Sequence, residues 1–514
     1  MCGILWHHCA NAFAGKETFL EFDEDSLARG IDTSIFDEHP VFKELVPYVA
    51  ARGPNYASFT RFGDKSWFSA VLSLREPLTK QCIDVADRFI LQYNGEIYNI
   101  GNYTNDTQYF AHLLSVTGNV VQALRELRGE FAFTVFDKET NCLYFGRDSV
   151  GKRSLSYRVT PGKELYVSSV SGSRDGFTNC EANAIYVYDT RTGNVRCDQT
   201  IRLSPYEVSR TSDSSMEYLS AATQDLFDVL SRATGLRIES IHPLHKENKP
   251  IGILFSGGLD CSVIAALICR HLSKRKCNTK VELLNVGFEN PRTGLKPGEV
   301  PDRLLARQST FKLRELFPNI EIILIEVDVS YEEFLNHRNA IIDLIYPKQT
   351  EMDLSIAAAF YFASRGRGFK RVEGGITVPY ERSGIVLFSG LGADELYGGY
   401  HKLANKTEEQ RCAELQSQIR NIHDRNLDRD DKIISSHGVE VRYPFLDEEV
   451  IEFSVRLPIN YKVNKLILRN MASELLDMED ISTEPKRAIQ FGAKSAKMTK
   501  DGNKLGTDML RAID

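Results

Sequence analysis

The pattern of apolar and polar positions divides the chain into two halves. In the first half, short segments rich in aromatic and branched residues predict β-strands. These segments are residues 67–74, 89–98, 131–137, 142–148 and 184–189. Turn-forming residues at 137–141 and 190–194 indicate hairpins, and residues 106–127 form the main helical stretch. This half is expected to be a β-rich α+β domain.

In the second half, apolar strands alternate with helices. The strands are predicted at 251–256, 281–288, 321–329 and 384–390, and the helices at 260–272, 301–317 and 331–346. This alternation indicates a parallel, doubly wound α/β sheet, in which ligands bind beyond the carboxyl ends of the strands. A polar, Ser-rich stretch at 204–218 is the candidate linker. We therefore predict domains at 2–205 and 221–514, joined by residues 206–220.

Composition and charge narrow the class of protein. The 514 residues are 42% hydrophobic and 26% charged, which is typical of a large globular chain. The net charge of −7 excludes a generally basic protein that coats nucleic acid. Ten scattered cysteines without a CxxC pair indicate free thiols in a reducing compartment.

The same sequence features bear on location and partners. Residues 1–15 contain no Lys or Arg, so no signal peptide is expected. The longest apolar stretch, 251–269, carries Asp260 and two glycines, which favours a strand, a turn and a helix over a membrane span. We expect a cytoplasmic protein without nucleic-acid or membrane partners. Whether it forms a homo-oligomer is left open.

Cys2 is the first candidate catalytic residue. If Met1 is removed, Cys2 carries both a thiol and an α-amine, whose pKa of about 7.7–8.0 suits a general base. One residue then supplies nucleophile and base, as in N-terminal-nucleophile hydrolases. The alternative is an ordinary buried cysteine.

Other residues in the first half could complete a site around Cys2. In RGPN (52–55), Arg52 offers a fixed fork for a carboxylate. In NGEIYN (94–99), the Asn94 amide and the Gly95 N–H could donate to a developing oxyanion. The carboxylates of Glu96 and Asp106 could hold a substrate ammonium group.

These motifs resemble class II glutamine amidotransferases, specifically the glutaminase half of asparagine synthetases. The family begins with MCGI, as here, and carries RGPD, an LSI-like strand, NGEIYN and an SD pair. This chain has RGPN, Leu72-Ser73-Leu74, NGEIYN and Asn105-Asp106. The resemblance implies an αββα N-terminal-nucleophile hydrolase sandwich. It also implies that Cys2 attacks the glutamine amide, that Asn94 and Gly95 form the oxyanion hole, and that Arg52, Leu72, Glu96 and Asp106 bind glutamine.

Two glycine-rich loops in the second half are candidates for phosphate binding. SGGLDCS (256–262) follows a strand and opens a helix, where glycines and free N–H groups suit an anion. Ser256 and Ser262 add hydroxyl donors, and Asp260 could hold Mg²⁺. A plain strand-to-helix turn is the alternative. SGLGADELYGGY (389–400) repeats the pattern and offers Asp394 as a second metal ligand.

Together the two loops resemble the ATP-pyrophosphatase domain of asparagine synthetases, an adenine nucleotide alpha hydrolase-like fold. The resemblance implies that ATP adenylates a carboxylate and that pyrophosphate leaves. The implied ATP-binding residues are Leu254, Ser256, Gly257, Gly258, Asp260, Ser262, Val286, Ser389 and Gly390, and the implied Mg²⁺ ligands are Asp260 and Asp394. A catalytic lysine of the family is best matched by Lys486, with Arg487 as the alternative.

Three further segments are expected to have structural roles. GRDSVGK (146–152) nearly matches a phosphate loop, but Arg153 and a following strand argue against that assignment. GVEVRYPFLD (438–447) matches a supporting run of the family, with Arg442 and Asp447 expected to pair. Lys494, Lys497 and Lys500 are expected to form a solvated helical face, with a phosphate clamp as the alternative.

The resemblance covers nearly the whole chain, and its nearest branch is the eukaryotic asparagine synthetase domain-containing proteins. In the second half, two positions depart from true asparagine synthetases. Leu391 replaces a Glu that is a candidate for handling a proton, a role for which Glu395 is a nearby substitute, and Cys261 replaces a Ser. The leading hypothesis is a two-site amidotransferase that uses glutamine, ATP and a carboxylate such as aspartate, with ammonia passing inside the protein. The alternatives are a non-catalytic or glutaminase-only protein with a binding or regulatory role, and a ring-closing synthetase.

Overall fold

The computed structural model describes residues 2–9, 17–172, 176–210, 215–372, 375–400, 403, 405–498 and 505–510. The chain divides into two compact units. The first comprises Met1–Ser204, Ile342–Lys348 and His423–Glu440, and the second comprises Pro205–Ile341, Gln349–Ile422 and Val441–Asp514. The first unit therefore includes two segments from the second half of the sequence, which the predicted linear division at 205 did not anticipate.

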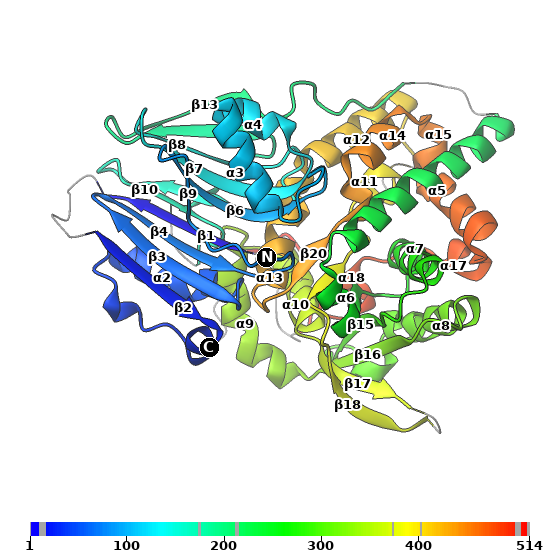
Figure 1. Ribbon diagram of the computed structural model, residues 1–514. Coiled ribbons are helices and arrows are strands. Elements are labelled where there is room, and N and C mark those ends of the chain that lie inside the picture. Colours follow the sequence, from blue (N-terminus) through cyan, green and yellow to red (C-terminus); the bar gives the residue numbers. More distant parts are fainter. Residues whose placement is uncertain are drawn as a thin grey trace. The chain divides into compact units, whose positions relative to one another are not determined.

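The first unit is built on two antiparallel sheets (Figure 1). One has the order β11 (Thr178–Asn179), β9 (Ser156–Val159), β10 (Leu165–Ser168), β1 (Gly3–His8), β4 (Lys65–Val71), β3 (Tyr56–Phe62) and β2 (Thr18–Asp23). The other has the order β13 (Asn194–Thr200), β12 (Ala184–Asp189), β8 (Cys142–Arg147), β7 (Gly129–Asp137), β6 (Phe89–Ile97) and β5 (Ile83–Val85).

The central strand β1 is buried along its whole length, and its side chains alternate between two cores. Ile4 and Trp6 pack between the sheets, and Leu5 packs on the other side with α2 (Pro40–Ala50). The second sheet is covered on its outer face by α3 (Asp106–Thr117) and α4 (Val120–Glu126) (Figure 1). The order of layers in this unit is helix, sheet, sheet, helix.

The predicted helical stretch 106–127 is two helices rather than one. Asn105 caps α3 by accepting hydrogen bonds from the N–H groups of Thr107 and Gln108. Gly118 ends α3 in the left-handed conformation, with φ of 56°. Asn119 then caps α4 by accepting from the Gln122 N–H. Smaller elements of the same unit are α1 (Glu24–Arg29) and α13 (Asp428–Ser435).

The second unit contains the alternating half of the chain. Its sheet has the order β18 (Thr377–Glu381), β17 (Arg367–Arg371), β16 (Ile322–Val329), β15 (Val281–Phe288), β14 (Ile251–Leu254), β19 (Val386–Phe388) and β20 (Glu440–Arg442). Strands β14, β15, β16 and β19 are parallel, as predicted, whereas β17 pairs antiparallel with β16 and forms a hairpin with β18.

Two helices precede the first strand of this sheet along the sequence, and the others come between or after its strands. They are α5 (Met216–Glu239), α6 (Pro243–Asn248), α7 (Leu259–Arg275), α8 (Pro301–Leu316), α9 (Tyr331–Ile345), α10 (Glu351–Arg365), α11 (Ala393–Leu396), α12 (Glu408–Ile422), α14 (Glu448–Arg456), α15 (Ile459–Lys462), α16 (Leu466–Asn470), α17 (Glu479–Thr483) and α18 (Ile489–Gly492). Among the described residues, no helix combines the length and apolar character needed to cross a membrane.

Several boundaries differ from the sequence-based expectation. Strand β14 ends at Leu254 and β19 spans only Val386–Phe388, because the residues beyond each strand belong to the glycine-rich turns. Helix α5 begins at Met216, inside the predicted linker 206–220. Lys494 and Lys497 have positive φ angles and are not helical, so the predicted helical face is wrong for them; Lys500 lies outside the described residues.

Candidate active sites

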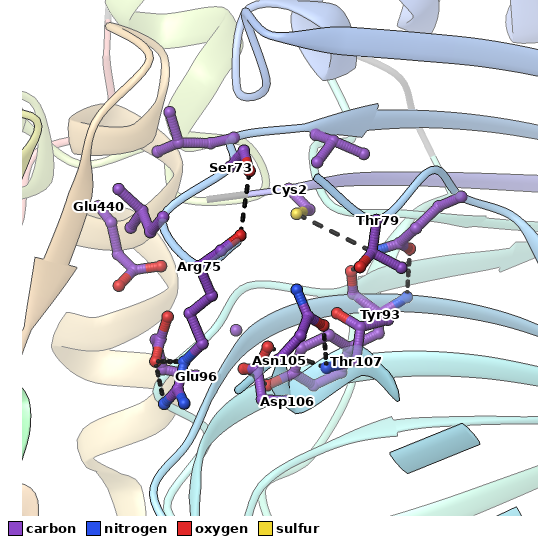
Figure 2. A pocket seen from close by; sticks show the side chains of 15 residues that line it. Cys2, Ser73, Arg75, Thr79, Tyr93, Glu96, Asn105, Asp106, Thr107 and Glu440 are labelled. Atoms are coloured by element: carbon purple, nitrogen blue, oxygen red, sulfur yellow. Dashed lines mark hydrogen bonds and ion pairs between the residues drawn. The ribbon is translucent and has the colours of Figure 1, made fainter. Parts of the chain in front are cut away.

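A pocket in the first unit brings together most of the residues predicted around Cys2 (Figure 2). It is lined by Cys2, Val71, Leu72, Ser73, Leu74, Arg75, Thr79, Gln81, Tyr93, Gly95, Glu96, Asn105, Asp106, Thr107 and Glu440. The residue before β1, strands β4 and β6, the N-terminus of α3 and the loop after β4 supply nearly all of these residues. Four of the six residues predicted around Cys2, namely Leu72, Gly95, Glu96 and Asp106, therefore line this pocket with Cys2 itself.

Cys2 and Asn94 are joined by a hydrogen bond across 92 residues of sequence. The Cys2 backbone N–H donates to Asn94 Oδ1 at 2.9 Å. This bond leaves Asn94 Nδ2 buried and without a hydrogen-bond partner among the described residues. A buried, unpaired donor is costly to keep, so its presence on the side chain that bonds the Cys2 backbone points to a function such as binding an oxyanion. Burial raises the pKa of the Cys2 thiol, which therefore needs a base to become a nucleophile.

Gly95 allows strand β6 to pass close to its neighbour β7. A Cβ atom at this position would lie 2.0 Å from the Glu130 carbonyl oxygen, and φ of Gly95 is 153°. Any other residue would push the two strands apart next to Asn94. The NGE sequence is thus explained locally: Asn supplies the amide, Gly permits the close approach, and Glu96 points its carboxylate at Arg75.

The two predicted ammonium-binding carboxylates have different surroundings. Asp106 is buried and accepts hydrogen bonds from the Tyr93 hydroxyl at 3.0 Å, the Ile97 N–H at 3.1 Å and the Thr107 N–H at 2.9 Å. Glu96 Oε2 accepts from Arg75 Nε at 2.9 Å and Nη2 at 2.7 Å (Figure 2). Sequence reasoning missed Arg75, although it directly follows the Leu72-Ser73-Leu74 motif.

Arg52 does not line the pocket. Its side chain is fully buried and pairs with Asp431 Oδ2 at 2.9 Å, while its Nε donates to the Cys2 carbonyl oxygen at 3.1 Å. Ser154 Oγ donates to the same Asp431 oxygen at 2.7 Å. Arg52 therefore holds the backbone of Cys2 in place, and Asp431 already balances the charge of Arg52.

The GRDSVGK segment has the structural role that its sequence suggested. Asp148 accepts hydrogen bonds from the N–H groups of Val150, Gly151 and Lys152 at 2.9–3.0 Å. The carboxylate thus occupies the backbone donors that a phosphate would need. Strand β9 then follows at Ser156, where a phosphate loop requires a helix.

A second candidate site lies in the second unit, at the carboxyl ends of β14 and β19. Gly257 has φ of 84°, and a Cβ there would lie 2.5 Å from the backbone nitrogen of Ala306 on α8. Ser262 Oγ and Ser309 Oγ both donate to the Gly257 carbonyl, at 3.1 and 2.7 Å. The turn is therefore held tightly against α7 and α8, with Gly258 as the N-cap of α7.

The two glycine-rich loops meet in this unit. A Cβ at Gly390 would lie 2.9 Å from Asp260. Lys465 Nζ contacts Asp260 Oδ2 and Asp394 Oδ1, each at 2.6 Å, and Lys486 also pairs with Asp394. The two carboxylates predicted to bind Mg²⁺ thus share a lysine that sequence reasoning missed, because no local motif marks a residue 205 positions away from Asp260.

The remaining predicted residues of this site are distributed around the loops. Leu254 and Val286 are buried on β14 and β15, and Ser389 Oγ accepts from the Leu391 N–H at 3.2 Å. Cys261 Sγ donates to the Gly258 carbonyl at 3.3 Å, so its thiol stabilises the turn. Arg487, the alternative to Lys486, lies 3.9 Å from Asp302 and not at Asp394.

The predicted internal pairing of GVEVRYPFLD takes a different form. Asp447 pairs with Arg237 of α5 at 2.7 Å, and Arg442 Nη1 donates to Ser240 Oγ at 2.6 Å and to the Arg237 carbonyl. Both residues therefore anchor the segment to the end of α5. Glu395, the proposed substitute for the missing Glu, accepts a hydrogen bond from Tyr400 Oη at 2.6 Å.

Comparisons with known proteins match two family models to different parts of the chain. Residues 239–415 and 404–511 match the family model described as asparagine synthase, and residues 75–173 match the glutamine amidotransferase domain. An asparagine synthetase domain-containing protein of Saccharomyces cerevisiae is 55% identical, covering 99% of both chains. Asparagine synthetase domain-containing protein 1 of Gallus gallus is 28% identical, covering 98% of both chains. Glutamine-hydrolyzing asparagine synthetase of Asparagus officinalis is 26% identical, covering 90% of this chain and 71% of its own length.

Proposed function

Because this chain belongs to the asparagine synthase family, we propose that it is a glutamine-hydrolysing, ATP-dependent amidotransferase. In this proposal the first unit is an N-terminal-nucleophile glutaminase, and the second is an ATP-pyrophosphatase domain that activates a carboxylate. Ammonia from glutamine replaces AMP on the activated carboxylate, and aspartate is the first acceptor to test.

The observation that carries the proposal is the hydrogen bond from the backbone N–H of Cys2, which lines the pocket, to the side chain of Asn94. Once Met1 is removed, the α-amine of Cys2 takes the thiol proton, and Sγ attacks the amide carbon of glutamine. The unpaired Asn94 Nδ2 and the Gly95 N–H stabilise the oxyanion of the tetrahedral intermediate. Ammonia leaves, and water then hydrolyses the thioester to give glutamate. Removal of Met1 is a requirement that intact-protein mass spectrometry can check.

The second site supports the ATP-dependent step. Mg²⁺ commonly binds proteins through one or two carboxylates together with substrate phosphates. Asp260 and Asp394, which one lysine bridges, fit this role, and Mg²⁺ bound there would neutralise phosphate charge. Gly257 and Gly258 let the backbone approach the phosphates, and Lys465 and Lys486 supply positive charge beside them.

The substitution Cys2→Ala tests the proposal. We expect it to abolish ammonia release from glutamine while leaving activity with added ammonium intact, because only the nucleophile of the first unit is lost. Cys142→Ala is the matched control, since Cys142 lies on β8 outside the pocket. Glutamine hydrolysis by the Cys2→Ala protein at the wild-type rate would refute the glutaminase assignment.

A glutaminase-only protein is the second candidate, and Leu391 favours it. Leucine cannot accept a proton where the family has a glutamate. Pyrophosphate release from ATP, measured with ammonium and a panel of carboxylates, separates the two candidates. Release with any carboxylate supports the synthetase, whereas ammonia release from glutamine without pyrophosphate release supports the glutaminase-only alternative.

A further inference from the structure

The glutamine pocket has a marked imbalance of charge. Its lining includes the carboxylates of Glu96, Asp106 and Glu440. Among the described residues that line it, Arg75 is the one side chain with a permanent positive charge. An α-amino acid carries an ammonium group that suits these carboxylates and an α-carboxylate that they repel. The α-carboxylate therefore needs a cation, and Arg75 is the one the pocket offers.

The guanidinium of Arg75 is held in place but not saturated. Nε and Nη2 bond to Glu96 Oε2, and Nη2 also donates to the Ile97 carbonyl at 2.8 Å. Nη1 has no hydrogen-bond partner among the described residues. Burial opposes its charge, but Glu96 and Asp106 hold the pKa of Arg75 above its ordinary value. The side chain is 8% exposed, so the group is fixed, charged and able to donate from Nη1.

Arg52, the arginine expected to bind the carboxylate, is committed elsewhere. All three of its nitrogens donate to groups of the protein: Asp431, the Cys2 carbonyl oxygen and Ser154 Oγ. Its side chain is fully buried, as is that of Asp431, which balances its charge. A substrate carboxylate at Arg52 would have to displace this pairing inside the protein.

We propose that Arg75 binds the α-carboxylate of the substrate amino acid, with Glu96 orienting the guanidinium and Asp106 facing the substrate ammonium group. This assignment rests on the proposed glutaminase function and transfers the role from Arg52. It gives Glu96 a positioning role in place of the ammonium-binding role predicted from sequence (Figure 2).

Equilibrium binding to the Cys2→Ala protein tests the assignment without requiring turnover. Isothermal titration compares glutamine with 4-aminobutanamide, which has the same amide and ammonium groups but no α-carboxylate. We expect Arg75→Met to weaken glutamine binding about tenfold or more, the usual effect of losing a charge-assisted hydrogen bond. Binding of 4-aminobutanamide should stay unchanged. Equal losses for both compounds, or no loss for glutamine, would overturn the assignment.

Two further variants control for misfolding and for the loss of an arginine elsewhere in the protein. Arg75→Lys keeps the charge but loses the fork, so it should give an intermediate affinity for glutamine and fold even if Arg75→Met does not. Arg88→Met removes an arginine that makes a comparable two-nitrogen pair with Asp137 outside the pocket, and it should leave glutamine affinity unchanged. If glutamine binding depends on Arg75 but the wild-type protein releases no ammonia, the proposed function fails while this assignment stands.

Discussion

The chemistry proposed for this protein depends on single side chains, and their partners come from distant parts of the sequence. Local motifs predicted Cys2, Asn94, Gly95 and Asp106 as site residues, because each lies in a short pattern of recognisable chemistry. They could not predict that Arg52 would be paired with a residue 379 positions away. Arg52 and Arg75 both lie near these motifs, and their side chains have the same chemistry. Only the structure shows that Arg75 lines the pocket and Arg52 does not.

Glu38 offers a test of buried electrostatics at this scale. Burial alone would raise its pKa, but hydrogen bonds from His7, Ser66 and Arg61 lower the pKa to about 2 from the ordinary 4.5. A lowered carboxyl pKa stabilises the fold above pH 4.5, and this contribution is lost as the pH falls toward 2.

We therefore expect the wild-type protein to lose up to about 3 kcal/mol more than Glu38→Gln between pH 5 and pH 2. Urea unfolding of both proteins across this range measures the difference. Parallel stability curves for the two proteins would contradict the electrostatic account.

At the scale of elements, hydrophobic periodicity predicted the strands and helices whose apolar residues are buried in a regular pattern. It did not predict that α13 would be buried. The sequence of this helix, DRDDKIIS, is mostly charged, yet all eight residues are buried. Their charges are paired within the first unit, with Asp428 bonded to Arg147 and Lys432, and Asp431 to Arg52 and Arg153. Such burial depends on partners distant in sequence, which a periodicity analysis cannot supply.

Removing one partner of this network should destabilise the first unit strongly. Asp431→Ala leaves Arg52 buried without its carboxylate, and a broken buried pair typically costs about 3–5 kcal/mol. Urea unfolding followed by tryptophan fluorescence measures the loss, because Trp6 and Trp67 both lie in the core of this unit. The control is Asp189→Ala, which removes the surface pair with Arg191 and should have a much smaller effect, because solvent screens such a pair. Equal effects of the two substitutions would refute the network.

The glycine-rich turn after β14 supports a second prediction at this scale. In Gly257→Ala, the added methyl group would lie 2.5 Å from the Ala306 nitrogen at a positive φ, so the turn must open. We expect ATP-dependent pyrophosphate release to be lost and ammonia release from glutamine to be retained. Gly298→Ala, where a Cβ meets nothing within 4 Å, is the control. Loss of both activities in Gly257→Ala would show that the turn supports more than the ATP site.

The whole molecule combines two units that the sequence distinguished by pattern. Strands rich in aromatic residues predicted the first, and alternating strands and helices predicted the second. The segments Ile342–Lys348 and His423–Glu440, which return to the first unit, could not be predicted because a division by pattern is linear along the chain. One of these segments places Glu440 at the pocket, within a motif that was assigned only a supporting role.

The central claim is that the two units perform consecutive steps of one reaction. The most direct measurement follows a heavy-nitrogen label from the amide of glutamine, in the presence of ATP and a panel of carboxylates beginning with aspartate. We expect labelled amide on one acceptor, with pyrophosphate released in equal amount and both products lost in Cys2→Ala. Labelled nitrogen found only as free ammonia, with no pyrophosphate released for any carboxylate, would contradict it.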